Sequence, residues 1–148
     1  MIENDNAYLM LVEDNEDDIE LTKRAIESSL NTNKMVIARD GQEASDYLFS
    51  EGDYAGQENQ LPGLILLDIN LPRISGLELL RRIRADQRTK FLPVVVLTVS
   101  DEQQDILNSY EFGANSYIRK PINVSEFLDS IKELEIYWML RNVMPQAK

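Results

Sequence analysis

The chain has 148 residues and a formal net charge of -11, and it contains neither cysteine nor histidine. Such a charge argues against a protein that neutralises many phosphates of DNA or RNA. Without Cys and His, the sequence excludes disulfides, thiolate nucleophiles, Cys/His zinc sites and histidine-based catalytic triads. Any chemistry must therefore use carboxylates, hydroxyls, lysine and a hard metal ion.

Short apolar runs alternate with longer amphipathic stretches along the chain. The apolar runs predict strands at residues 8–12, 35–38, 64–67, 94–97 and 117–118. The polar stretch 51–63, with its glycines and Pro62, is expected to be a long loop. The expected helical faces, in chain order, are Ile19, Thr22, Ile26 and Leu30; Ala44, Tyr47 and Leu48; Leu79, Leu80 and Ile83; Ile106, Leu107 and Tyr110; and Phe127, Leu128, Ile131, Leu134 and Trp138.

The predicted order is therefore five strands and five helices in strict alternation. Near-continuous apolar strands are typical of a parallel sheet that is covered on both faces. With right-handed crossovers, this order predicts a doubly wound (βα)5 fold of flavodoxin-like type, a five-stranded parallel sheet in a three-layer α/β/α sandwich.

The length suits a single domain spanning residues 1–148, with a core at about 7–138, a C-terminal extension at about 139–148 and no effector domain. No apolar run approaches the ~20 residues of a transmembrane helix, and the first residues lack the basic-then-apolar order of a signal peptide. We expect a cytoplasmic protein that binds neither nucleic acid nor a membrane.

Residues able to bind a metal ion or a phosphate follow four of the five expected strands. They are Glu13 and Asp14, Asp68, Thr98, and Tyr117 with Lys120 and Pro121. In open parallel sheets, ligands bind outside the carboxyl ends of the strands. Crowded carboxylates need a cation among them, and Mg²⁺ prefers carboxylate, carbonyl and water oxygens. Aspartate can attack a phosphoryl group directly, and lysine and hydroxyl groups stabilise the phosphoryl oxygens.

Each of these residues also has an ordinary structural interpretation. Glu13 and Asp14 could cap the first helix, and Asp68 could be a turn residue. Thr98 could be an ordinary strand residue and Lys120 a solvated charge. Four strand-end coincidences in one fold nevertheless favour a common site over separate explanations.

These motifs resemble the receiver domains of bacterial two-component response regulators, and the resemblance covers nearly the whole chain. The matching segments are Leu11-Val12-Glu13-Asp14-Asn15, Leu66-Leu67-Asp68-Ile69-Asn70-Leu71-Pro72 followed by Gly76, Val96-Leu97-Thr98, and Tyr117-Ile118-Arg119-Lys120-Pro121. The loop at 51–63 and the tail with Tyr137 and Trp138 look like those of the single-domain regulators that partner phytochrome kinases.

The resemblance implies a role for each site residue. Asp68 would be the phosphoacceptor, and Mg²⁺ would be bound by Asp14, Asp68 and the backbone carbonyl of Asn70. Glu13 would act on the metal through water. Lys120 would pair with the acceptor carboxylate and then with the phosphoryl group.

The resemblance also implies a switch and two structural residues. Thr98 would move toward the phosphoryl oxygens, and Tyr117 would rotate inward behind it. Pro121 would follow a cis peptide that aims the preceding lysine, and Gly76 would lie where the chain turns into a helix. Val99 departs from the family, where this residue is usually small, and its bulk is expected to slow phosphotransfer or dephosphorylation.

The implied partner is a sensor histidine kinase, with a phytochrome kinase as the candidate, or a phosphotransfer protein. The signal would leave through the face of the fourth helix, fifth strand and fifth helix, and this face together with the C-terminal tail is the candidate homodimer surface. A second apolar set predicts a homodimer or partner surface, unless the tail folds back onto its own core; it consists of Ile136, Met139, Leu140 and Val143. The basic run Arg81, Arg82, Arg84, Arg88 and Lys90 is expected to be a solvated face.

Three other classes of protein compete with this interpretation. A phosphohydrolase of the haloacid dehalogenase type needs a second aspartate two residues after the nucleophile, where this chain has Asn70, which cannot transfer a proton in that way. The intact residue set argues against a pseudo-receiver that lacks phosphotransfer. A Rossmann-type nucleotide binder would need glycines where residues 13–17 are acidic. We therefore expect a domain that catalyses only its own phosphorylation and dephosphorylation.

Overall fold

The computed structural model describes residues 8–27, 34–57, 60–120 and 123–145. Five parallel strands form one sheet: β1 (Tyr8–Val12), β2 (Lys34–Ala38), β3 (Leu64–Leu67), β4 (Val94–Thr98) and β5 (Ser116–Arg119). Their order in the sheet is β2-β1-β3-β4-β5. The chain leaves β1 toward one edge and returns to its other side as β3, so the topological switch point lies between these two strands.

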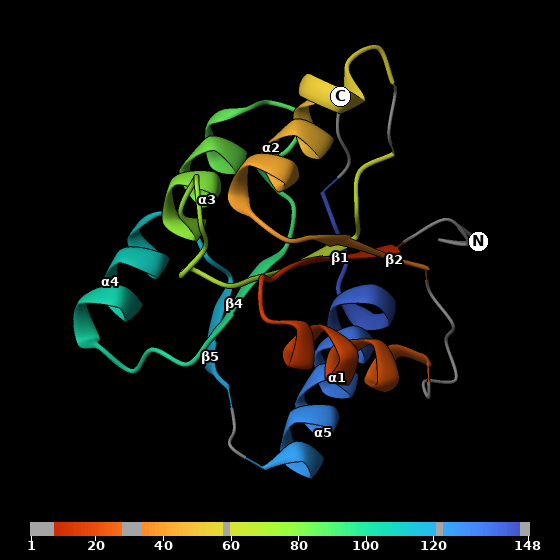
Figure 1. Ribbon diagram of the computed structural model, residues 1–148, viewed down its shortest axis with the longest axis vertical. Coiled ribbons are helices and arrows are strands. Elements are labelled where there is room, and N and C mark those ends of the chain that lie inside the picture. The colour runs from red at the N-terminus through yellow and green to blue at the C-terminus, as the bar shows by residue number, and fades with distance from the viewer. Residues whose placement is uncertain (1–7, 28–33, 58–59, 121–122, 146–148) are drawn as a thin grey trace.

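Five α-helices cover the sheet: α1 (Glu16–Glu27), α2 (Gly41–Phe49), α3 (Gly76–Ala85), α4 (Gln103–Glu111) and α5 (Val124–Glu135). Figure 1 shows α1 and α5 together on one face of the sheet and α2, α3 and α4 on the other. The predicted doubly wound, three-layer fold is confirmed. None of the helices in the described parts of the chain is long and apolar enough to cross a bilayer.

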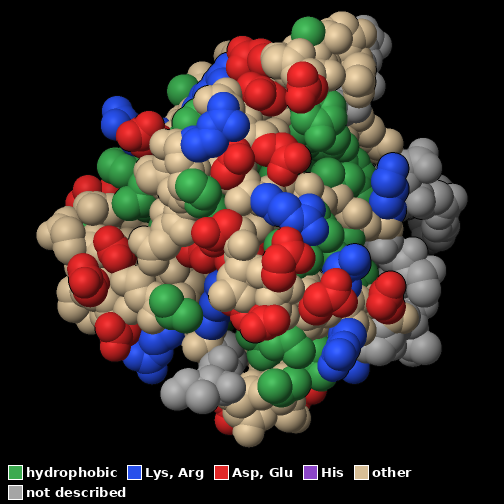
Figure 2. Space-filling view, viewed as in Figure 1, with side chains coloured by type: hydrophobic (Ala, Val, Ile, Leu, Met, Phe, Trp, Pro, Cys, Tyr) green, Lys and Arg blue, Asp and Glu red, His purple; other side chains and the backbone are tan. Residues whose placement is uncertain are grey.

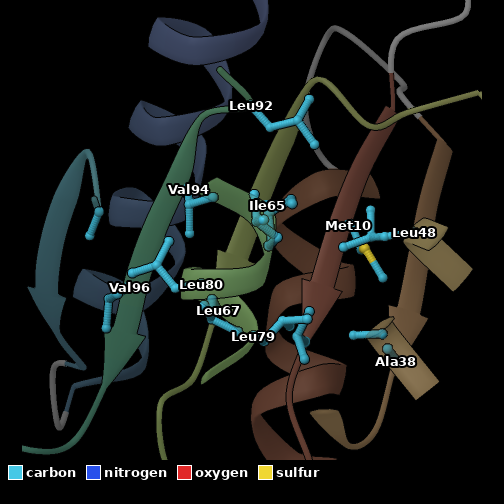
Figure 3. Packing of buried hydrophobic residues seen from close by; sticks show 14 of the residues in the cluster. Met10, Ala38, Leu48, Ile65, Leu67, Leu79, Leu80, Leu92, Val94 and Val96 are labelled. Atoms are coloured by element: carbon cyan, nitrogen blue, oxygen red, sulfur yellow. The ribbon is translucent and has the colours of Figure 1, made fainter. Parts of the chain in front are cut away.

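Each face of the sheet has its own hydrophobic cluster. Figure 3 shows the cluster under α2 and α3, which includes Leu48, Leu79 and Ile65 of β3. On the other face, Ile19 of α1 and Phe127 of α5 pack against the sheet. All residues of β1, β3 and β4 are buried, which explains why these strands are apolar without alternation.

The expected loop at 51–63 contains a short 3₁₀ turn, Gly52–Tyr54, and is tied to α3. Arg82 lies over the ring of Phe49, 4.0 Å from its centroid, and pairs with Glu51 at 2.7 Å. The prediction of a solvated basic face is wrong for Arg84, which is half-buried. Its guanidinium donates to the backbone carbonyls of Gly113, Lys90 and Leu92 and joins the end of α3 to both neighbouring loops.

The C-terminal tail departs from the predicted helical periodicity. After α5 the chain continues as a π-helix, Ile136–Arg141, with Asn142 N donating to Tyr137 O at 2.7 Å. Glu135 is buried beside Leu134, and the next buried apolar residue is Met139, four positions after Glu135. The assignment of Met139 to an outward apolar set is therefore wrong, and Trp138 only packs partly buried against this cluster.

Other predicted apolar positions are exposed. Ile136 and Val143 of the second apolar set are exposed, as predicted, while the side chain of Leu140 lies outside the described residues. On α4, Leu107 and Tyr110 are about half exposed and only Ser109 is buried. The helical face predicted on α4 thus faces solvent in part.

Candidate functional site

Three carboxylates meet at the switch point of the sheet. Glu13 and Asp14 follow β1, and Asp68 follows the adjacent β3; the last residues of the two strands, Val12 and Leu67, are paired in register. One oxygen from each of the three carboxylates lies within 4.8 Å of the others. We call Glu13, Asp14 and Asp68 the acidic trio. The sequence predicted all three.

Burial differs within the acidic trio. Glu13 and Asp68 are only 2% and 7% exposed, whereas Asp14 is exposed. Burial, with the charge of Asp68 as a smaller contribution, raises the pKa of the Glu13 carboxyl to about 7, against the lowering effect of its hydrogen bond from Lys120. The site therefore disfavours full ionisation unless more positive charge enters it.

Backbone amides hold the two buried carboxylates in place. Asn15 N donates to Glu13 Oε2 at 3.2 Å, and Asn70 N donates to Asp68 Oδ1 at 3.0 Å. The cap of α1 is Asn15, whose side chain accepts a hydrogen bond from Asp18 N at 3.0 Å. Helix capping thus does not account for Glu13 and Asp14.

Lys120 reaches the acidic trio from the end of β5. Its Nζ donates to Glu13 Oε1 at 2.6 Å and lies 3.4 Å from Asp68 Oδ2, and its side chain is 6% exposed. Burial alone would lower the pKa of Lys120, but hydrogen bonds to Asp18 and Glu13 and the charge of Asp68 raise it above its usual value. The lysine is therefore a fixed positive charge in the site.

Asp18 is a contact that the sequence analysis missed. Lys120 Nζ donates to Asp18 Oδ2 at 2.8 Å, a shorter distance than that to Asp68. Asp18 lies in the first turn of α1, which begins directly after the acidic residues at the end of β1. This closeness along the chain is the one signal that could have placed Asp18 beside the site. Figure 2 shows how acidic side chains, with basic ones among them, spread over the face that carries α1.

Thr98 and Tyr117 lie at the ends of β4 and β5. Thr98 is fully buried, and its Oγ1 has no hydrogen-bond partner among the described residues. An unpaired buried hydroxyl costs about 1–3 kcal/mol, which a ligand oxygen could relieve. Tyr117 packs partly buried against the cluster under α3, and its hydroxyl donates to Ser100 O at 2.7 Å.

Gly76 brings the start of α3 against the backbone of Asp68. A Cβ at this position would lie 2.3 Å from the Asp68 carbonyl oxygen. At Gly41, the first residue of α2, a Cβ would lie 1.8 Å from Ile74 O in the same β3–α3 connection. Both glycines let the loop after Asp68 fold closely, because any larger residue would meet backbone atoms.

The structure describes Val99 but not Pro121, the two remaining residues that the sequence analysis singled out. Val99 is 68% exposed beside the site, so its side chain stands in solvent next to the buried Thr98. Pro121 and the expected cis peptide lie outside the described residues. The acidic trio and the orphaned Thr98 hydroxyl suit a hard cation such as Mg²⁺ and the oxygens of a phosphoryl group.

Fold and site together define a class: doubly wound α/β domains with an acidic, metal-type site and a buried lysine at the switch point. The chain belongs to the response regulator receiver domain family, whose model matches residues 9–132. Receiver domains are signalling domains, and the predicted family is confirmed.

The chain resembles two regulatory proteins along nearly its whole length. The chain is 34% identical over 144 residues to response regulator Rcp1 of Synechocystis sp., covering 97% of both chains. It is 36% identical over 141 residues to the probable methanogenesis regulatory protein FilR2 of Methanothrix harundinacea, covering 95% of this chain and 89% of that one.

Two solved structures resemble it closely. The phosphorylated cyanobacterial phytochrome response regulator RcpA is 40% identical with a TM-score of 0.88, covering 95% of this chain and 99% of that one. The Mn²⁺-bound form of Rcp1 is 34% identical with a TM-score of 0.86 and the same coverage.

Proposed function

We propose that this receiver domain accepts a phosphoryl group on Asp68 in a Mg²⁺-dependent reaction. The observation that carries the proposal is the buried Asp68 carboxylate, with two further acids and Lys120 around it. The phosphorylated state of RcpA and the Mn²⁺ in Rcp1 support it as properties of relatives. Asn70 in place of a second aspartate supports a domain without turnover of an external substrate.

In the proposed transfer, an oxygen of the Asp68 carboxylate attacks the phosphorus of a phosphohistidine. The new O–P bond forms as the P–N bond breaks, and the imidazole leaves with the bonding electron pair and takes a proton from solvent. Asp14, Asp68 and the Asn70 carbonyl would hold Mg²⁺, with Glu13 acting through water, and the ion would supply positive charge beside the phosphoryl oxygens. Lys120 donates to a phosphoryl oxygen, and the Thr98 hydroxyl acquires a partner there.

Thr98 and Tyr117 would carry the signal outward. A Thr98 hydroxyl drawn toward the phosphoryl group favours the partly buried position of Tyr117, whose hydroxyl is tied to the β4–α4 loop through Ser100. The affected surface comprises α4, β5 and α5, with β5 between the two helices (Figure 1). We propose a sensor histidine kinase as donor, with a phytochrome kinase as the candidate because RcpA is a phytochrome response regulator, or a phosphotransfer protein. The predicted cytoplasmic location suits such partners.

Intact-mass spectrometry after incubation with acetyl phosphate and Mg²⁺ tests the proposed chemistry. We expect one added phosphoryl group, absent without Mg²⁺ and absent in Asp68→Asn. Asp101→Asn, at an exposed aspartate beyond β4 on the same edge, is the matched control and should keep the adduct. If the parent gained no adduct, Val99→Ala would be tested in the same way. Failure of both proteins would exclude obstruction by Val99 as the cause, and the proposal would fail.

We propose that the output includes a homodimer formed through the tail. Ile136, Tyr137 and Val143 are 42%, 52% and 89% exposed, although apolar side chains of this size usually avoid solvent in such a group. Sedimentation of Val143→Glu should show a weaker dimer than the parent. Gln87→Glu, at an exposed residue after α3, adds the same charge outside α4, β5, α5 and the tail and should not weaken the dimer. Monomers of the parent at high concentration, with and without beryllium fluoride, would contradict this contact.

A further inference from the structure

The ammonium group of Lys120 is shared unequally among three carboxylates. Its distances are 2.6 Å to Glu13, 2.8 Å to Asp18 and 3.4 Å to Asp68. The two short contacts both pull the group away from the proposed acceptor, toward β1 and α1. The lysine is thus held beside Asp68 but bonded more closely to other residues.

Asp18 differs from the other two carboxylates in its place. It projects from the first turn of α1, its side chain is 23% exposed, and it is not part of the acidic trio whose oxygens converge within 4.8 Å. A metal ion bound by the acidic trio would compete with Lys120 for Glu13 and Asp68. It would leave the contact between Lys120 and Asp18 in place.

We propose that Asp18 is a positioning residue that holds Lys120 on the α1 side of the site. The contact limits how closely the ammonium group approaches Asp68, a carboxylate that would bind the metal ion, and it also withholds the lysine from the phosphoryl group. This inference rests on the proposed function of Asp68 and adds a residue to that site.

The two effects of Asp18 have opposite signs. In Asp18→Asn the charge-assisted bond is lost, so Lys120 turns to Glu13 and Asp68 and competes with Mg²⁺; the Mg²⁺ dissociation constant should rise about fivefold. At saturating Mg²⁺, the freed lysine should instead bind beryllium fluoride, a phosphoryl analogue, about fivefold more tightly. If Asp18 only supported the local structure, its replacement would weaken the binding of both ligands.

Calorimetric titration of both ligands into the parent, Asp18→Asn and Asp17→Asn tests the inference. Asp17 is exposed, precedes Asp18 in the same helical turn, and carries the same charge, so its variant measures the effect of net charge alone. In a Lys120→Met background, where Asp18 has no lysine to hold, Asp18→Asn should change the Mg²⁺ affinity no more than Asp17→Asn does.

The outcomes separate this inference from the proposed function. A parent that binds no beryllium fluoride in the presence of Mg²⁺ overturns the proposed function, and the inference with it. The inference alone is overturned if the parent binds beryllium fluoride and Asp18→Asn binds both ligands with the same affinity as Asp17→Asn. It is also overturned if Asp18→Asn binds both ligands more weakly. An equal effect of Asp18→Asn with and without Lys120 also overturns it, because Asp18 would then act by its charge only.

Discussion

Replacement of Lys120 by methionine is expected to slow phosphoryl transfer to Asp68 on the order of 100-fold and to destabilise the metal-free protein by about 3 kcal/mol. The ammonium group is nearly inaccessible to solvent and contacts Glu13, Asp18 and Asp68. Its removal leaves two buried carboxylates without an opposite charge. Protonation of Glu13, whose pKa is already raised, limits the cost at neutral pH.

The same replacement should strengthen Mg²⁺ binding. Lys120 and a metal ion are alternative sources of positive charge for the acidic trio, so loss of one raises the affinity for the other. Saturating Mg²⁺ should therefore raise the free energy of unfolding more in Lys120→Met than in the parent. Chemical denaturation with and without Mg²⁺ measures this difference, and acetyl phosphate labelling measures the transfer rate.

Arg119→Met is the matched control for this prediction. Arg119 precedes Lys120, but its side chain is 64% exposed and pairs with Asp101 at 3.3 Å on the surface. Exposed pairs contribute about 0–1 kcal/mol, so this variant should remain close to the parent in both stability and transfer rate. Equal losses in the two variants, or a parental transfer rate in Lys120→Met, would contradict the role of the buried lysine.

The strands and the strand-end residues could be predicted because their physical signals are local. A parallel strand buried on both faces must be apolar throughout, as in Leu64–Leu67, and the polar residue that follows it is then conspicuous. Topology alone brings the residues after β1 and β3 together. The acidic trio follows from these two facts without knowledge of any side-chain conformation.

The role of Asp18 could not be predicted in this way. Its contact with Lys120 joins residues 102 positions apart and depends on how closely the end of β5 approaches the first turn of α1. The burial of Met139 was missed for a different reason. The apolar pattern leads from Leu134 to Trp138, whereas the buried positions run from Ile131 through Glu135 to Met139. A buried glutamate gives no apolar signal, so this face could not be followed from hydrophobic spacing.

The metal-free protein is expected to lose about 3 kcal/mol of stability between pH 5 and pH 8 through Glu13 alone. Below the ordinary pKa of 4.5, the carboxyl is protonated in both the folded and the unfolded chain. As pH rises, the unfolded chain releases this proton first, whereas burial keeps it on the folded protein up to a pKa of about 7. The raised pKa thus gives stability that is present at low pH and lost as pH passes 7.

Glu13→Gln isolates this contribution, because glutamine has nearly the shape of the protonated acid but cannot ionise. Its stability should match that of the parent near pH 5 and exceed it by about 3 kcal/mol near pH 8.5. Glu16→Gln, at an exposed glutamate whose pKa is lowered by its hydrogen bond with Arg39, should leave the slope in this range unchanged. Saturating Mg²⁺ should remove the slope from the parent, since a nearby cation favours the ionised carboxyl. A parental slope in Glu13→Gln would assign the pH dependence to another group. It would also contradict the need for added positive charge at this edge of the sheet.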